Sequence, residues 1–101
     1  MNTETYINEL RDNFEKALEI MISKNKDYAG KDDPFKNFEM SSIVGVTPER
    51  AILVRVTDKI SRISNLLDKS NDVSDEKITD TVLDCINYLN ILKVYLENKD
   101  D

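Results

Sequence analysis

The sequence predicts an all-α protein that forms one domain over residues 1–101. Three segments carry apolar residues at the three- and four-residue spacing of an amphipathic helix, and each begins with a residue that can cap a helix N-terminus. A short polar turn joins the last two segments, which is typical of an antiparallel helical hairpin. We therefore expect helices at 3–24, 48–67 and 75–97, with a long loop at 25–46.

The first predicted helix, 3–24, has Thr3 as a plausible N-cap. One stripe of apolar side chains runs along it and gives it a core-packing role: Ile7, Leu10, Phe14, Ala17, Leu18 and Met21. The segment that follows reads as a loop because Gly30 and the Asp33-Pro34 pair are typical turn residues.

The predicted loop carries side chains that suit a nucleotide, because aromatic rings stack on bases and basic groups hold phosphate. The aromatic and basic candidates are Lys26, Tyr28, Phe35 and Phe38; Asn37, between the two phenylalanines, is a further candidate through the family resemblance given below. The alternative is that Phe35 and Phe38 close the end of a helical bundle, since exposed phenylalanines are uncommon.

The second helix, 48–67, begins at Thr47-Pro48-Glu49, which supplies a cap, a proline at the first position and an acid in the first turn. The third, 75–97, follows Ser74 as its cap. The third helix is apolar on two faces, and one neighbour covers only one of them. We expect the first helix to cover one face and another subunit to cover the other. The bundle is then completed in a homo-oligomer, a dimer or higher.

Composition narrows the classes of function. Fourteen basic and twenty acidic residues give a net charge of −6, which argues against general nucleic-acid binding but leaves room for a small phosphorylated ligand. The single cysteine, Cys85, fits a reducing compartment. No signal peptide or membrane-spanning run is evident, so we expect a cytoplasmic protein with no membrane partner. Without histidine, a metal site is built from oxygen ligands, which favours Mg²⁺ or Mn²⁺; neither zinc nor haem is expected.

Acidic and basic residues of the last two helices form the candidate site. Its predicted metal ligands are four carboxylates, on the pattern by which facing helices hold metals: Asp58, Glu76, Asp80 and Asp84. Beside them lie residues suited to phosphate and nucleotide contacts: Arg55, Lys59, Arg62, Asn87 and Tyr88. The alternative is structural, because the same acids and bases can pair across the hairpin and set its register.

These residues occur in a recognisable order. The order is Lys26-x-Tyr28-Ala29-Gly30, Asp33-Pro34-Phe35-x-Asn37-Phe38, Arg55-x-x-Asp58-Lys59-x-x-Arg62 and Asp80-Thr81-x-x-Asp84-x-x-Asn87-Tyr88. It resembles the nucleotide modification associated domain 1 family of small, mostly phage-encoded proteins, over residues 15–95. The resemblance implies a nucleotide ligand, and the host cytoplasm as the compartment if the chain is phage-encoded.

More distantly, the hairpin resembles the all-α nucleotide pyrophosphohydrolases of the MazG and dimeric dUTPase type. Those enzymes hold Mg²⁺ with E-x-x-E on one helix and E-x-x-D on the next. Here the first motif falls on Arg55-x-x-Asp58 and the second on Thr81-x-x-Asp84, so each keeps only its second acid. The resemblance implies either Mg²⁺-dependent hydrolysis or a non-catalytic sponge for cyclic or ADP-ribose-type nucleotide immune signals. An interaction module with purely structural charges is a third hypothesis.

Overall fold

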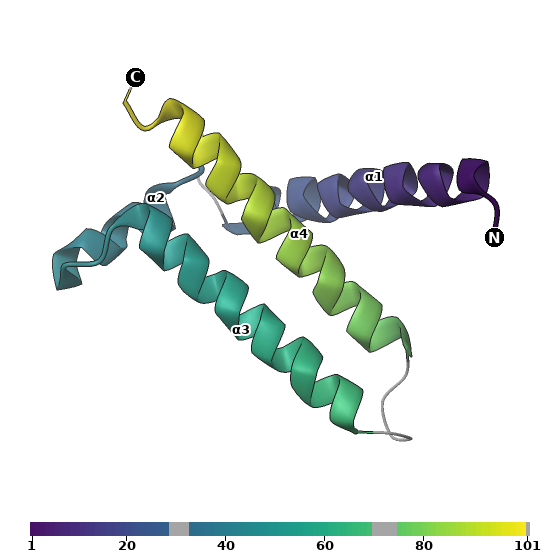
Figure 1. The fold of residues 1–101 in the computed structure, drawn as a ribbon. Helices are drawn as coiled ribbons and strands as arrows, with labels where there is room; N and C mark the ends of the chain where they lie inside the picture. Colours follow the sequence, from purple (N-terminus) through teal and green to yellow (C-terminus); the bar gives the residue numbers. More distant parts are fainter. Residues whose placement is uncertain (29–32, 70–74, 101) are drawn as a thin grey trace.

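The computed structural model describes the backbone of residues 1–28, 33–69 and 75–100, and their side chains except at 25–28 and 75–77. All regular elements in these ranges are helical, as the sequence predicts (Figure 1). They are α1 (Thr3–Tyr28), α2 (Lys36–Glu39), the 3-10 helix η1 (Met40–Val44), α3 (Pro48–Asp68) and α4 (Asp75–Asn98). No helix within the described ranges is long and apolar enough to cross a bilayer.

The region predicted as a loop contains regular structure. α1 continues to Tyr28, and α2 and η1 occupy 36–44, so the prediction of a continuous loop over 25–46 was wrong at these positions. Side chains start and end this stretch: the Asp33 carboxylate accepts from the Phe35 N–H at 2.9 Å, and the Ser41 hydroxyl donates to the Val46 carbonyl at 2.9 Å. Local hydrogen bonds of this kind leave no apolar periodicity in the sequence.

α3 and α4 lie side by side and antiparallel, which is the predicted hairpin (Figure 1). The Thr47 hydroxyl accepts from the Arg50 N–H at 3.4 Å, and Pro48 opens the first turn of α3. At the same end of the hairpin, Lys99 Nζ lies 3.3 Å from Glu49 Oε2. This ion pair ties the start of α3 to the residues just after α4.

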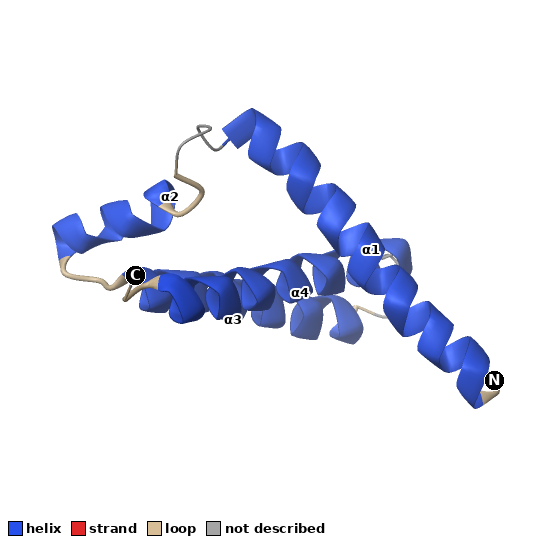
Figure 2. Cartoon of the chain, turned by 90° about the horizontal axis from the view of Figure 1, so that it is seen from above, coloured by secondary structure: helices blue, strands red, loops and turns tan. Residues whose placement is uncertain are grey.

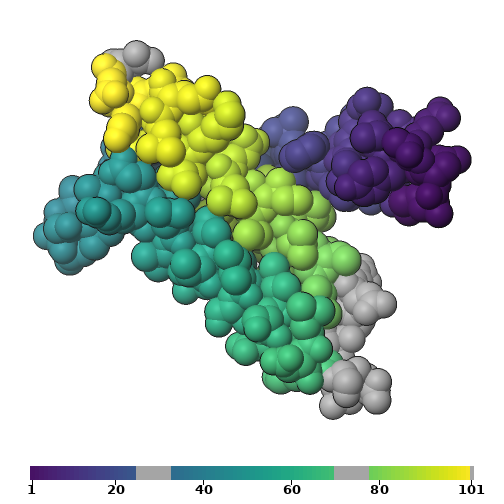
Figure 3. All heavy atoms as spheres, in the orientation of Figure 1, coloured from purple at the N-terminus to yellow at the C-terminus, as the bar shows by residue number. Residues whose placement is uncertain are grey.

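α1 crosses α4 and packs on it only through its C-terminal half. Ala17 is 2% exposed, whereas every side chain from 1 to 16 is exposed. Residues 3–16, which we call the arm, project beyond the hairpin (Figure 1, Figure 3). The sequence predicts core packing along the whole of α1; the arm departs from this because no described part of the chain reaches it.

The hydrophobic core within the described ranges is small. Its buried apolar side chains are Ala17, Ile52 and Val56, and two polar side chains, Thr81 and Asn87, are buried with them. Ile52 and Val56 lie one turn apart on α3 and therefore mark the side of that helix that packs on α4.

Candidate functional site

A cavity of about 630 Å³ opens beside α3 and is bounded on one side by Tyr88 of α4. This volume falls within the usual range for small-molecule sites, roughly 300–1,000 Å³. Its lining is Arg55, Asp58, Lys59, Ser61, Arg62, Asn65, Leu66, Lys69 and Tyr88. Four basic groups and one acidic group give the lining a net charge of +3 in a chain of net charge −6. We call it the cationic cavity.

The helical repeat of α3 creates this concentration of charge. Arg55, Lys59 and Arg62 are separated by four and three residues, so they project from one face of the helix. Lys69 follows Arg62 by seven residues and extends the same face. Ile52 and Val56 meanwhile hold the neighbouring face against α4, which fixes the rotation of α3 about its axis.

Two lysines from different helices neutralise Asp84. Lys59 Nζ of α3 lies 3.2 Å from Asp84 Oδ2, and Lys24 Nζ of α1 lies 3.3 Å from Asp84 Oδ1. The Asp84 side chain is only 22% exposed, so both of its oxygens are largely committed to these contacts. The sequence does not predict that Lys24 meets Asp84, because nothing in it relates two residues 60 positions apart.

The two arginines behave differently from Lys59. Arg55 and Arg62 line the cationic cavity and are exposed, and neither forms an ion pair with any described residue. The structural alternative has acids and bases pairing across the hairpin. Among the described side chains Lys59 forms such a pair with Asp84, and the Glu76 side chain lies outside them. Among the described residues, no carboxylate pairs with either guanidinium, so both can meet an anion.

Among the described side chains, the predicted metal ligands Asp58, Asp80 and Asp84 do not form a ligand group. Asp58 and Asp80 are exposed, and the Glu76 side chain lies outside the described residues. No group of three or more potential ligands gathers among the residues described. A divalent cation at Asp84 would face two ammonium groups already within 3.3 Å of its oxygens. The described side chains around Asp84 therefore do not fit a Mg²⁺ or Mn²⁺ site.

A second cavity, of about 530 Å³, lies between α1, α4 and the turn before α2. It is mostly apolar and is lined by Leu18, Met21, Ile22, Pro34, Phe35, Asn87, Asn90, Ile91 and Val94. Asn87 is 7% exposed here. Asn87 and Tyr88 therefore line different cavities although they are adjacent in sequence, because successive residues point about 100° apart around a helix.

The residues predicted to bind a nucleotide do not all line the same cavity. Arg55, Lys59, Arg62 and Tyr88 line the cationic cavity, and Phe35 and Asn87 line the second one. Asn37 and Phe38 belong to α2 and line neither, and the side chains of Lys26 and Tyr28 lie outside the described residues.

Phe35 also has a packing role. Its ring meets the Tyr95 ring edge to face, with centroids 5.3 Å apart and planes at 74°. The contact holds the segment before α2 against the C-terminal part of α4, which agrees with the alternative that Phe35 closes one end of the helical assembly.

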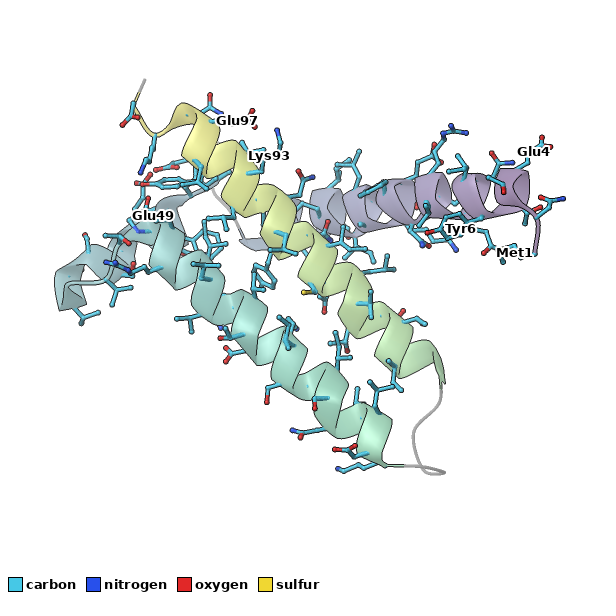
Figure 4. All side chains as sticks on the ribbon, viewed as in Figure 1. Met1, Glu4, Tyr6, Glu49, Lys93 and Glu97 are labelled. Carbon is cyan, nitrogen blue, oxygen red and sulfur yellow. The ribbon has the colours of Figure 1, made fainter. Side chains whose placement is uncertain are left out.

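Two carboxyl groups outside both cavities have shifted pKa values. A hydrogen bond with the Asp33 side chain raises the pKa of Glu39, helped by desolvation and by the charge of Asp33. The pKa of Glu49 is lowered, first by a hydrogen bond from the Thr47 side chain and then by Lys99. Figure 4 shows Glu49 at the end of the hairpin where α4 finishes. These shifts concern helix ends and the α2 region, not the residues that line the two cavities.

No protein-family model matches this chain, and neither a curated protein nor a solved structure is found to be similar to it. The geometry of its own side chains therefore carries the functional interpretation.

Proposed function

We propose that this protein binds a nucleotide or a nucleotide-derived small molecule through its phosphate groups, in the cationic cavity. The observation that carries this proposal is the local charge. An acidic chain gathers four basic side chains around one opening, and two of them, Arg55 and Arg62, have no acidic partner among the described residues. Guanidinium groups that line a cavity and pair with no described carboxylate favour a ligand that brings its own negative charge.

The side chains at the opening suit phosphate in particular. A guanidinium presents parallel N–H groups that match two phosphate oxygens. Such charge-assisted hydrogen bonds are among the strongest hydrogen bonds in proteins. Arg55 and Arg62 lie two helical turns apart, about 10 Å along the axis, so they can hold an extended or a two-phosphate group from both ends. Tyr88 supplies an aromatic ring on the α4 side for a base to stack on.

Binding is better supported than hydrolysis. The Mg²⁺-dependent reaction implied by the distant resemblance needs carboxylates free to hold a metal, whereas both Asp84 oxygens face lysines. We therefore favour sequestration, in which the ligand is held and released intact. In a phage-infected host cytoplasm, such a protein would lower the free concentration of a nucleotide signal.

Native mass spectrometry of freshly purified protein is the first test, because a tightly held nucleotide adds its own mass to the complex. Isothermal titration calorimetry then measures Kd for ADP-ribose, cyclic dinucleotides and nucleoside triphosphates, with and without Mg²⁺. Denaturing the complex and analysing the ligand separates the two mechanisms. Intact ligand supports sequestration. Hydrolysis would release pyrophosphate from a nucleoside triphosphate, and cleavage fragments other than pyrophosphate from ADP-ribose or a cyclic dinucleotide.

Three glutamine variants locate the site. Arg55→Gln and Arg62→Gln each remove a charge-assisted contact, so we expect Kd to rise about 10- to 100-fold. Arg50→Gln is the matched control: it removes the same charge from an exposed position of the same helix, outside the lining. Equal weakening by all three variants, or no binding by any of these ligands, would contradict the proposal.

A further inference from the structure

One broad face of the α3–α4 hairpin is covered by no part of the chain that the structure describes (Figure 2). Figure 2 shows the C-terminal half of α1 and the short helix α2 on one side of the hairpin, with no described element over the opposite side. We call this opposite side the open face. The cationic cavity and the Lys59–Asp84–Lys24 contacts involve the side of the hairpin that α1 approaches.

Two rows of half-exposed apolar side chains run along the hairpin. In each row the residues are seven positions apart, so they stack almost directly above one another on the helix. The α3 row is Leu53, Ile60 and Leu67, which are 45%, 54% and 66% exposed. The α4 row is Val82, Leu89 and Leu96, which are 39%, 49% and 46% exposed.

Both rows belong to the open face. Ile60 is two residues from Arg62, and Leu89 is two residues from Asn87, which places each about 160° around its helix from that neighbour. Arg62 lines the cationic cavity, and Asn87 is buried in the cavity between α1 and α4. Each row therefore points away from the side that α1 covers.

The total solvent-exposed area of the chain also indicates that a partner covers part of its surface. The chain has a mass of 11.7 kDa and exposes 7964 Å². A compact monomer of that mass exposes about 5,900 Å². The excess, about 2,000 Å², is the amount that each partner buries in an extensive permanent homodimer.

We propose that the open face binds a second copy of this chain, hairpin against hairpin, in a twofold-symmetric dimer. Rows with a seven-residue spacing on two antiparallel helices are the seam by which such hairpins form a four-helix bundle. A twofold contact also requires one self-complementary patch, which two similar apolar rows provide. The cationic cavity stays outside this contact, so the dimer does not depend on the proposed ligand.

The arm of α1 gives a further reason to expect that the open face is covered by a second copy of this chain. In Figure 2 it continues past the level of the hairpin, toward the side of the open face. Its apolar stripe is the continuation of the stripe that buries Ala17 on α4, yet Tyr6, Leu10 and Phe14 are 53%, 40% and 64% exposed. Tyr6 and Met1 lie on one side of the arm, apart from Glu4 (Figure 4). A hairpin seated on the open face would bury this remaining stripe.

Sedimentation equilibrium of the full chain, from about 1 to 100 µM without added nucleotide, tests the proposal. We expect twice the mass of one chain for the wild type. Leu89→Ala removes a contact that occurs twice in a symmetric dimer, so we expect the dimer Kd to rise about tenfold or more. Asn90→Ala is the control, because it truncates the next residue of α4, which borders the cavity on the α1 side.

A wild-type chain that is folded by circular dichroism and monomeric throughout this range would overturn the proposal. So would an unchanged dimer Kd in both Leu89→Ala and Ile60→Ala. If Leu89→Ala proves too unstable to sediment, the wild-type Tm decides: it rises with protein concentration for a dimer and stays constant for a monomer.

Discussion

Replacing Asp84 by asparagine separates the structural interpretation of this residue from the metal-ligand interpretation. The substitution keeps the size of the side chain and removes the negative charge that faces two lysines. Lys59 lies 3.2 Å from one oxygen and Lys24 lies 3.3 Å from the other. The Lys59 side chain is 28% exposed and that of Lys24 is 53% exposed, so solvent weakens the second contact more than the first.

The expected loss follows from these exposures. The partly buried Lys59 contact contributes about 1 kcal/mol, and the half-exposed Lys24 contact contributes about 0.5 kcal/mol or less. We therefore expect Asp84→Asn to lower the free energy of unfolding by about 1–1.5 kcal/mol. Double-mutant cycles with Lys59→Gln and Lys24→Gln should assign the larger coupling to Lys59.

Urea denaturation followed by circular dichroism, at one fixed protein concentration, measures this change. Asp80→Asn is the control, because Asp80 is an exposed carboxylate one turn away and forms no ion pair with a described residue. Equal stability of the wild type and Asp84→Asn would refute the assigned ion pairs.

Ligand affinity gives the second measurement on the same variant. Removing the Asp84 charge releases Lys59 into the cationic cavity, so we expect a phosphate-bearing ligand to bind as tightly as before or more tightly. If Asp84 were instead a Mg²⁺ ligand, the same substitution would weaken metal-dependent binding of the nucleotide. If Asp84→Asn abolishes a Mg²⁺ requirement together with nucleotide binding, the metal interpretation is correct and the structural one is wrong.

Two further predictions concern the ends of the hairpin. Phe35→Leu removes the edge-to-face contact with Tyr95, and we expect urea denaturation to show a loss of about 0.5–1.5 kcal/mol; no loss would mean that the ring contact is dispensable. The pKa of Glu49 is lowered from 4.5, so its contribution to stability is present above that value and is lost as the pH falls through the lowered pKa. An NMR titration should show that Thr47→Ala raises this pKa more than Lys99→Gln does, because the Thr47 hydrogen bond is the larger cause; the reverse order would contradict that ranking.

Part of the candidate site could be predicted from sequence because it depends on one helix. Arg55, Lys59 and Arg62 share a face of α3 for the same local reason that α3 is a helix, and all three line one cavity. The metal cluster could not be predicted reliably in this way. Whether Asp58, Asp80 and Asp84 converge depends on how two helices rotate against each other, and spacing within each helix does not fix that rotation.

The sequence by itself determined the three long helices, the start of α3 at Thr47-Pro48 and the seven-residue apolar rows, because these follow from hydrogen bonding and side-chain spacing within a few residues. The tertiary structure decided which charges meet. Asp84 finds Lys59 and Lys24 at sequence separations of 25 and 60 residues. Such contacts depend on the packing of whole helices, in which burial of Ala17, Ile52 and Val56 sets how each helix faces its neighbours.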